Sequence, residues 1–196
     1  MTQSSPVEGL IFDCDGTLAD TMPLHWEAWQ KVTVRHGVKF DEERFYALGG
    51  VPSRHILAML REEQGLDIDP LAVAKEKEQV YLKTLHHVGP IEQVVAIARE
   101  HHGRLPMAVA SGGTRHVINK VLVHLGIRNL FLAVVTSEDV ELQKPAPDIF
   151  LEAARRIGIA PQRCRAFEDT DLGMTAIRAA GMDAADVREI LLPRSR

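Results

Sequence analysis

Two aspartates, Asp13 and Asp15, lie one residue apart directly after the apolar run 9–12. Because side chains alternate along a strand, both carboxylates of a regular strand would face the same side and repel each other. A divalent cation such as Mg²⁺ would compensate this charge, since it takes oxygen ligands and needs only one or two carboxylates beside a substrate phosphate. Gly16 would then allow a sharp turn. The alternative is a strand followed by an ordinary turn, because Asp, Gly and Thr are common turn residues.

Three later segments also carry groups that bind phosphate or metal. Ser111 and Gly112 follow a second apolar run, where a hydroxyl and backbone amides at the start of a helix can donate hydrogen bonds to phosphate. Lys144 offers an ammonium in the loop before Pro145, and Glu168 and Asp169 form a second acidic pair. The first two segments have plainer alternatives: Ser111 could belong to a helix cap, and a loop lysine is usually solvated.

Short apolar runs alternate with amphipathic segments over most of the chain. Repeated strand–helix units predict a parallel sheet covered on both faces, with ligands bound beyond the carboxyl ends of the strands. The acidic, hydroxyl and lysine segments all fall at or just after such ends. Asp171 is expected to cap the last of the long helices. The predicted strands are 10–13, 106–111, 131–135, 163–167 and 182–187, and the predicted helices are 94–102, 117–125, 150–157 and 174–180.

Residues 21–88 interrupt this alternation. The segment shows helical spacing only, is divided by glycines, and contains Asp69-Pro70, which is a good helix start. We therefore expect two domains. Residues 1–20 and 89–196 would form the α/β core, and residues 21–88 a helical cap.

Together the four segments resemble, in order, the four signatures of the haloacid dehalogenase superfamily, and most closely its β-phosphoglucomutase-like branch with small sugar-phosphate phosphatases. The resemblance implies a Rossmann-like three-layer α/β fold with a parallel sheet and a small all-α cap inserted after the first strand. It also implies that Asp13 is a nucleophile and that Asp15 is a general acid and base. Mg²⁺ would be held by Asp13, Asp169, Glu168 and the backbone carbonyl of Asp15.

The helical insert would supply substrate recognition. Thr21 and His25 match substrate-side positions of that branch, and Arg54 is a candidate anchor for a sugar or a second phosphate. Lys77 is a similar but weaker candidate. Trp29 shares a helix face with His25 and is expected to be mostly structural.

Composition restricts the function classes. The formal net charge is −4, and no basic run of five residues occurs, which argues against nucleic acid as a partner. The apolar runs are too short to cross a membrane. The two cysteines, Cys14 and Cys164, are expected to be free buried thiols, in keeping with a cytoplasmic protein. We expect a monomer that takes a small phosphorylated metabolite.

The leading hypothesis is a Mg²⁺-dependent phosphatase acting on a sugar phosphate through an aspartyl-phosphate. The alternative is a β-phosphoglucomutase with the same core residues. Gly89-Pro90, where close relatives carry Pro-Gly, favours the hydrolase. A dehalogenase would not need the acidic pair 168–169. A non-catalytic regulator would be expected to lack the nucleophile or a metal ligand.

Overall fold

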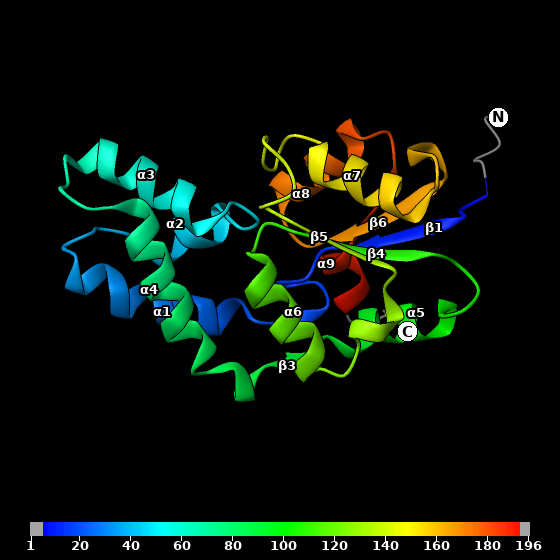
Figure 1. The fold of residues 1–196 in the computed structure, drawn as a ribbon, viewed down its shortest axis with the longest axis horizontal. Coiled ribbons are helices and arrows are strands. Elements are labelled where there is room, and N and C mark those ends of the chain that lie inside the picture. Colours follow the sequence, from blue (N-terminus) through cyan, green and yellow to red (C-terminus); the bar gives the residue numbers. More distant parts are fainter. Residues whose placement is uncertain (1–5, 193–196) are drawn as a thin grey trace.

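In the computed structural model, which describes residues 6–192, five parallel strands form one sheet with helices on both faces (Figure 1). The strands run in the order β5-β4-β1-β6-β7, so the first strand is central and the connections cross on both sides. The predicted α/β fold class is therefore confirmed. The strands are β1 (Gly9–Phe12), β4 (Met107–Ser111), β5 (Ala133–Thr136), β6 (Cys164–Glu168) and β7 (Asp183–Asp186).

Alternation along β1 builds two cores, one on each face of the sheet. Leu10 and Phe12 belong to the core beneath α5, α6 and α9, whereas Ile11 belongs to the core beneath α7 and α8 (Figure 1). Within the first core, the Phe12 ring stacks on Phe167 at 4.6 Å and meets the edge of Phe131 at 5.8 Å. The covering helices are α5 (Glu92–His101), α6 (Arg115–His124), α7 (Asp148–Ile157), α8 (Asp171–Ala179) and α9 (Val187–Leu191).

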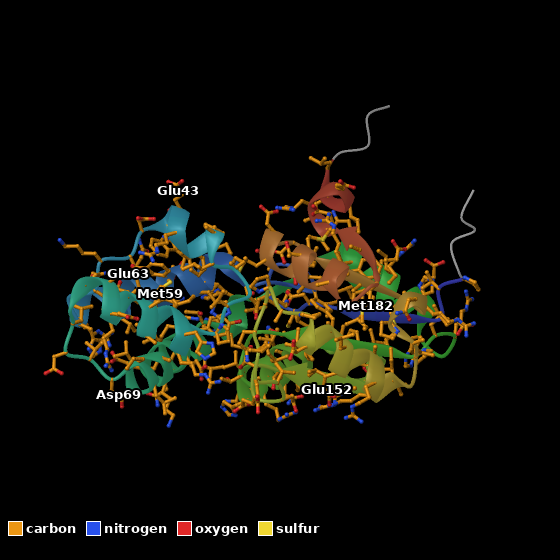
Figure 2. The ribbon with its side chains drawn as sticks, turned by 90° about the horizontal axis from the view of Figure 1, so that it is seen from above. Glu43, Met59, Glu63, Asp69, Glu152 and Met182 are labelled. Atoms are coloured by element: carbon orange, nitrogen blue, oxygen red, sulfur yellow. The ribbon has the colours of Figure 1, made fainter. Side chains whose placement is uncertain are left out.

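The segment between β2 (Ala19–Asp20) and β3 (Gly89–Pro90) is helical, as predicted, and these two short strands pair antiparallel where the chain leaves and re-enters the sheet region. This insert lies beyond the carboxyl ends of the strands and has its own apolar core (Figure 1). Figure 2 shows Glu43 and Asp69 pointing outward from it. The insert contains α1 (Met22–Arg35), α2 (Glu42–Ala47), α3 (Ser53–Gln64), α4 (Pro70–Leu82) and the 3₁₀ turn η1 (Leu85–His87).

Local signals fix most helix ends. Asp69 accepts a hydrogen bond from the Leu71 amide and Pro70 opens α4, so the predicted helix start is confirmed. Gly65 ends α3 at φ +62°, a conformation that favours glycine. No helix among residues 6–192 combines the length and the apolar character that crossing a membrane requires.

Two local predictions were wrong. Asp171 does not cap α8 but is its first residue, because the Thr170 hydroxyl accepts the hydrogen bond from the Gly173 amide. The third strand does not begin at Phe131. That residue follows the 3₁₀ turn η2 (Arg128–Leu130), and its carbonyl accepts a hydrogen bond from the Arg128 guanidinium.

The aromatic packing beneath β1 yields a stability prediction. Phe131→Ala should lower the free energy of unfolding by about 3–5 kcal/mol, because it removes a buried ring from the contact with Phe12. The neighbouring Leu132 is 71% exposed, so Leu132→Ala should change stability by less than about 0.5 kcal/mol. Urea unfolding of both variants measures the difference, and similar losses would contradict this packing.

Candidate active site

The Lys144 ammonium joins two buried carboxylates at the carboxyl end of the sheet. Its Nζ lies 2.7 Å from Asp13 Oδ1, directly after β1, and 2.6 Å from Glu168 Oε2, at the end of β6. All three side chains are buried. Burial alone would lower the pKa of Lys144, but the two carboxylates outweigh it and raise that pKa. The lysine is therefore charged and bonded in place.

Three carboxylates meet beside this ammonium. One oxygen each from Asp13, Glu168 and Asp169 lie within 4.8 Å of one another, which suits a metal ion. Burial, and then the charge of Glu168, raise the pKa of Asp13 well above its usual range and that of Asp169 to about 7. The cluster offers hard oxygen donors, and its negative charge exceeds what one lysine can balance. Both properties fit Mg²⁺.

Neighbouring hydroxyl groups orient the two acids at the end of β6, Glu168 and Asp169. Thr17 donates to Asp169 Oδ1 at 2.9 Å, and Thr170 donates to Glu168 Oε1 at 2.8 Å. The same Glu168 oxygen accepts from the backbone amide of Thr170 at 3.1 Å. A Cβ on Gly173 would collide with the Glu168 carboxyl group, so the first turn of α8 requires glycine there. Sequence reasoning missed Thr170, whose place after the acidic pair was the available signal.

The carboxylate of Asp15 is oriented by different partners. Thr21 donates to its Oδ1 at 2.7 Å, His25 Nε2 lies 3.3 Å from the same oxygen, and Ser111 Oγ lies 3.5 Å from Oδ2. Burial works against ionisation of Asp15, but the His25 and Thr21 hydrogen bonds lower its pKa below the usual value. Asp13 and Asp15 therefore have different environments although they lie two positions apart.

His25 and Lys77 extend this contact into the insert. Lys77 Nζ lies 2.8 Å from His25 Nδ1. An ammonium can only donate, so Nδ1 accepts and Nε2 carries the proton that faces Asp15. Burial lowers the pKa of Lys77 to about 8, and burial together with Lys77 lowers that of His25. The Tyr81 ring stacks on the imidazole at 3.8 Å, and Trp29 is buried in the insert core. Lys77 was only a weak candidate from the sequence, because the sequence does not show that α4 buries its side chain beside His25.

A loop of the insert lies against the sheet region. A Cβ on Gly112 would collide with the Gly50 carbonyl, and a Cβ on Gly50 would lie 3.1 Å from Lys144 Cδ. Ser111 ends β4, and its Oγ accepts a hydrogen bond from the Gly113 amide at 3.1 Å, which fixes the turn before α6. The insert is thus closed over Lys144 in this conformation.

A cavity of about 300 Å³ lies between the insert and the sheet region. Asp13, Asp15, Ser111 and Gly112 line it, and so does His25. This volume suits a small metabolite.

Arg54 lines the same cavity, but its side chain is exposed, and within residues 6–192 it makes no hydrogen bond or ion pair with the carboxylates. Cys14 and Cys164 are free and buried, as predicted. Burial raises the pKa of the Cys14 thiol, which makes it a poor nucleophile.

The buried lysine predicts a pH-dependent stability effect. Lys144→Met should lower the unfolding free energy of the metal-free protein by about 3–5 kcal/mol at pH 8, because Asp13 and Glu168 lose their counter-charge. Without the ammonium the folded-state pKa of Asp13 rises further, so the folded variant takes up a proton that the unfolded chain lacks. The free energy of that uptake falls as the pH approaches the ordinary Asp pKa of 3.8, so the loss should be smaller at pH 5 than at pH 8. Urea unfolding with a chelator at both pH values tests this.

Lys31→Met provides the control, since Lys31 makes a solvent-exposed pair with Glu27 and should matter little at either pH. If Lys144→Met lowered the free energy of unfolding equally at pH 5 and pH 8, repulsion among the buried carboxylates would not explain the loss.

Comparison with known proteins agrees with this geometry. The fructose-1-phosphate phosphatase YqaB of Escherichia coli is 45% identical over 181 residues, which cover 92% of this chain and 96% of that protein. A phosphorylated carbohydrates phosphatase of Thermotoga maritima is 28% identical over 181 residues, covering 90% and 83%. The crystal structure of a β-phosphoglucomutase from Clostridium difficile superposes with a TM-score of 0.83 at 26% identity, covering 92% and 84%.

The family model for haloacid dehalogenase-like hydrolases matches residues 10–187, a range that begins in β1 and ends at the first residue of α9. The match therefore includes the strand ends that carry the carboxylates, the turn after β4, the loop of Lys144 and the helical insert. This chain belongs to the haloacid dehalogenase-like hydrolase family.

Proposed function

We propose that this protein is a Mg²⁺-dependent phosphatase that hydrolyses a small sugar phosphate through an aspartyl-phosphate. The observation that carries the proposal is the pair of differently held aspartates. Asp13 is bonded to a charged lysine beside the acidic cluster, whereas Asp15 faces the insert through Thr21 and His25. One carboxylate is thereby suited to attack phosphorus and the other to move a proton.

In the first step, a carboxylate oxygen of Asp13 attacks the phosphorus atom. The bond between phosphorus and the sugar oxygen breaks, and that oxygen takes a proton from Asp15. The low pKa of Asp15 in the unliganded site must rise for this step. The negative charge of a bound phosphate ester would raise it, since nearby like charge disfavours ionisation.

In the second step, water attacks the phosphorus of the aspartyl-phosphate. The water loses a proton to Asp15, inorganic phosphate leaves, and the Asp13 carboxylate is restored. His25, with its Nε2 proton directed at Asp15 by Lys77, would hold Asp15 in position for both transfers. Thr21 supports the same oxygen of Asp15.

Asp13, Glu168, Asp169 and the backbone carbonyl of Asp15 would hold the Mg²⁺ ion. The three carboxylates already lie together, and their surplus negative charge raises two of their pKa values, so the donor set fits such an ion. When bound, Mg²⁺ supplies positive charge that offsets the repulsion between Asp13 and a phosphate dianion.

The remaining groups would bind substrate. The Ser111 hydroxyl and the Gly112 amide line the cavity and would donate hydrogen bonds to phosphate oxygens. Lys144, whose ammonium is bonded to Asp13, would add a further donor. Arg54, exposed at the cavity, would contact the sugar.

Residues 21–88 would act as a cap that opens for exchange and closes to exclude water. The paired linkers β2 and β3 and the close approach of Gly50 to Gly112 support this assignment.

The alternative, a β-phosphoglucomutase, would use the same core and pass the phosphoryl group to a second sugar hydroxyl. The 45% identity to a protein named as a phosphatase favours the hydrolase, whereas the mutases among the relatives are more distant. A non-catalytic regulator is disfavoured because Asp13, Lys144 and Asp169 are all present and joined in one cluster.

We also propose that the protein acts as a monomer in the cytoplasm. Two free, buried thiols and no disulfide between them are in keeping with a reducing compartment.

The nucleophile assignment predicts the effect of Asp13→Asn. The amide is nearly the same size but a poor nucleophile, so hydrolysis of p-nitrophenyl phosphate should fall by about a thousandfold or more. Circular dichroism should show an unchanged fold. Activity within tenfold of the parent protein would refute the role of Asp13.

The acidic cluster predicts a coupling between Mg²⁺ and pH. In the metal-free protein the pKa of Asp169 lies near 7, above its ordinary value of 3.8, so the folded state keeps a proton that the unfolded chain releases. Folding stability without metal should then fall as the pH rises through that interval. Mg²⁺ displaces the proton, so it should raise the melting temperature more at pH 8 than at pH 6.

Asp169→Ala should weaken Mg²⁺ binding at least about tenfold in a calorimetric titration. Asp171→Ala is the matched control, since that carboxylate is exposed and pairs with Arg188 instead. Equal Mg²⁺ affinity in Asp169→Ala and the parent protein would contradict the site.

A further inference from the structure

One loop of the insert, residues 48–52 between α2 and α3, extends toward the sheet region (Figure 1). Gly49 in this loop is buried, and a Cβ added to it would lie 2.8 Å from Cγ2, the methyl carbon of Thr170. A Cβ added to Gly50 would lie 3.1 Å from Lys144 Cδ. The loop therefore rests directly on Thr170 and Lys144, and the two glycines permit this close approach.

The two residues beneath the loop also hold Glu168. Thr170 donates to Glu168 Oε1 from its hydroxyl group at 2.8 Å and from its backbone amide at 3.1 Å. Lys144 donates to the other carboxylate oxygen, Oε2, at 2.6 Å. Each oxygen of Glu168 is thus bonded to a residue that contacts the insert.

The position of Thr170 should matter for metal binding. Mg²⁺ requires a nearly ideal octahedral arrangement of its oxygen ligands, so a small displacement of one carboxylate weakens binding. Loss of the groups that orient metal ligands typically lowers metal affinity by about 10- to 100-fold. A displacement of Thr170 would move the hydroxyl and the amide that are bonded to Glu168. Contact between Gly49 and the Thr170 methyl group limits such a displacement when the insert is closed.

We propose that Thr170 is a positioning residue that couples closure of the insert to the metal site. Its methyl group supports the loop at Gly49, and its hydroxyl and amide groups position Glu168. Coupling between two sites is reciprocal, so the closed insert would in turn be favoured when Mg²⁺ is bound. Water would then be excluded chiefly from the metal-loaded site. This inference rests on the proposed Mg²⁺-dependent function and adds the means by which that site is regulated.

The first test enlarges Gly49 and then makes room for the added methyl group. Gly49→Ala should weaken Mg²⁺ binding at least about tenfold in a calorimetric titration, although this residue offers no side-chain ligand. Thr170→Ser removes the opposing methyl group and keeps the hydroxyl, so Gly49→Ala/Thr170→Ser should regain most of the lost affinity. The Tyr46 carbonyl, 3.2 Å from the same Cβ position, is present in both variants, so this rescue would identify Thr170 as the source of the loss.

The matched control is Gly89→Ala, which adds a methyl group to a linker of the same insert. A Cβ there has no neighbouring atom within 4 Å, so the Mg²⁺ affinity of this variant should equal that of the parent protein. Circular dichroism checks that each variant is folded.

Hydrogen exchange in the parent protein tests the reverse direction without any substitution. Mass spectrometry would compare peptides in saturating Mg²⁺ with the same peptides in a chelator. Peptides that span residues 45–52 should exchange more slowly with Mg²⁺, whereas peptides from residues 58–64, in the later turns of α3, should change little.

Unchanged Mg²⁺ affinity in folded Gly49→Ala, or a loss that Thr170→Ser does not relieve, would overturn the inference and leave the proposed function standing. Exchange of residues 45–52 that does not respond to Mg²⁺ would overturn it too, and this result decides the question even if Gly49→Ala fails to fold. If the parent protein itself bound no Mg²⁺, the proposed Mg²⁺-dependent function would fail, and the inference with it.

Discussion

Asp13, Glu168 and Asp169 bring three acidic groups together at the end of a buried sheet, and the site depends on how their negative charge is stabilised. Unpaired charges there would be very costly, and Lys144 offsets part of that cost through two bonds shorter than 3 Å. The remaining charge raises the pKa of Asp13 and Asp169. This surplus negative charge would attract a cation, and the cation would in turn bind a phosphate group. The unfavourable repulsion among the three carboxylates is therefore the physical basis of the proposed chemistry.

The topology makes this concentration of charge possible. The two strands that carry Asp13 and Glu168 are neighbours in the sheet although the residues lie far apart in sequence, and parallel pairing of β1 with β6 sets Phe12 opposite Phe167. The residues that follow must therefore meet. The insert adds a second set of contacts from outside the sheet, in which Lys77 and His25 orient Asp15 without touching the acidic cluster. Asp13 and Asp15 therefore bond to different groups although only one residue separates them.

Much of this arrangement could be predicted from the sequence. Alternating runs predicted the sheet, and because parallel strands end at one edge, the four polar segments could be expected to converge there. Features that depend on packing could not be predicted. Whether Lys77 is solvated or buried depends on how α4 lies against α1, and Thr170 displaced Asp171 as the helix cap because its hydroxyl also reaches Glu168. The exposed position of Arg54 likewise follows from the placement of α3.

The central claim is that a carboxylate oxygen of Asp13 forms the covalent bond to phosphorus in the intermediate. The modified residue can be detected directly. The protein would be mixed with fructose 1-phosphate and Mg²⁺, quenched in acid during turnover, and treated with borohydride, which reduces an acyl phosphate of aspartate to homoserine. Peptide mass spectrometry should then find homoserine at position 13 only in samples that contained substrate. Phosphate release with position 13 unmodified, or with the modification at position 15, would contradict the account.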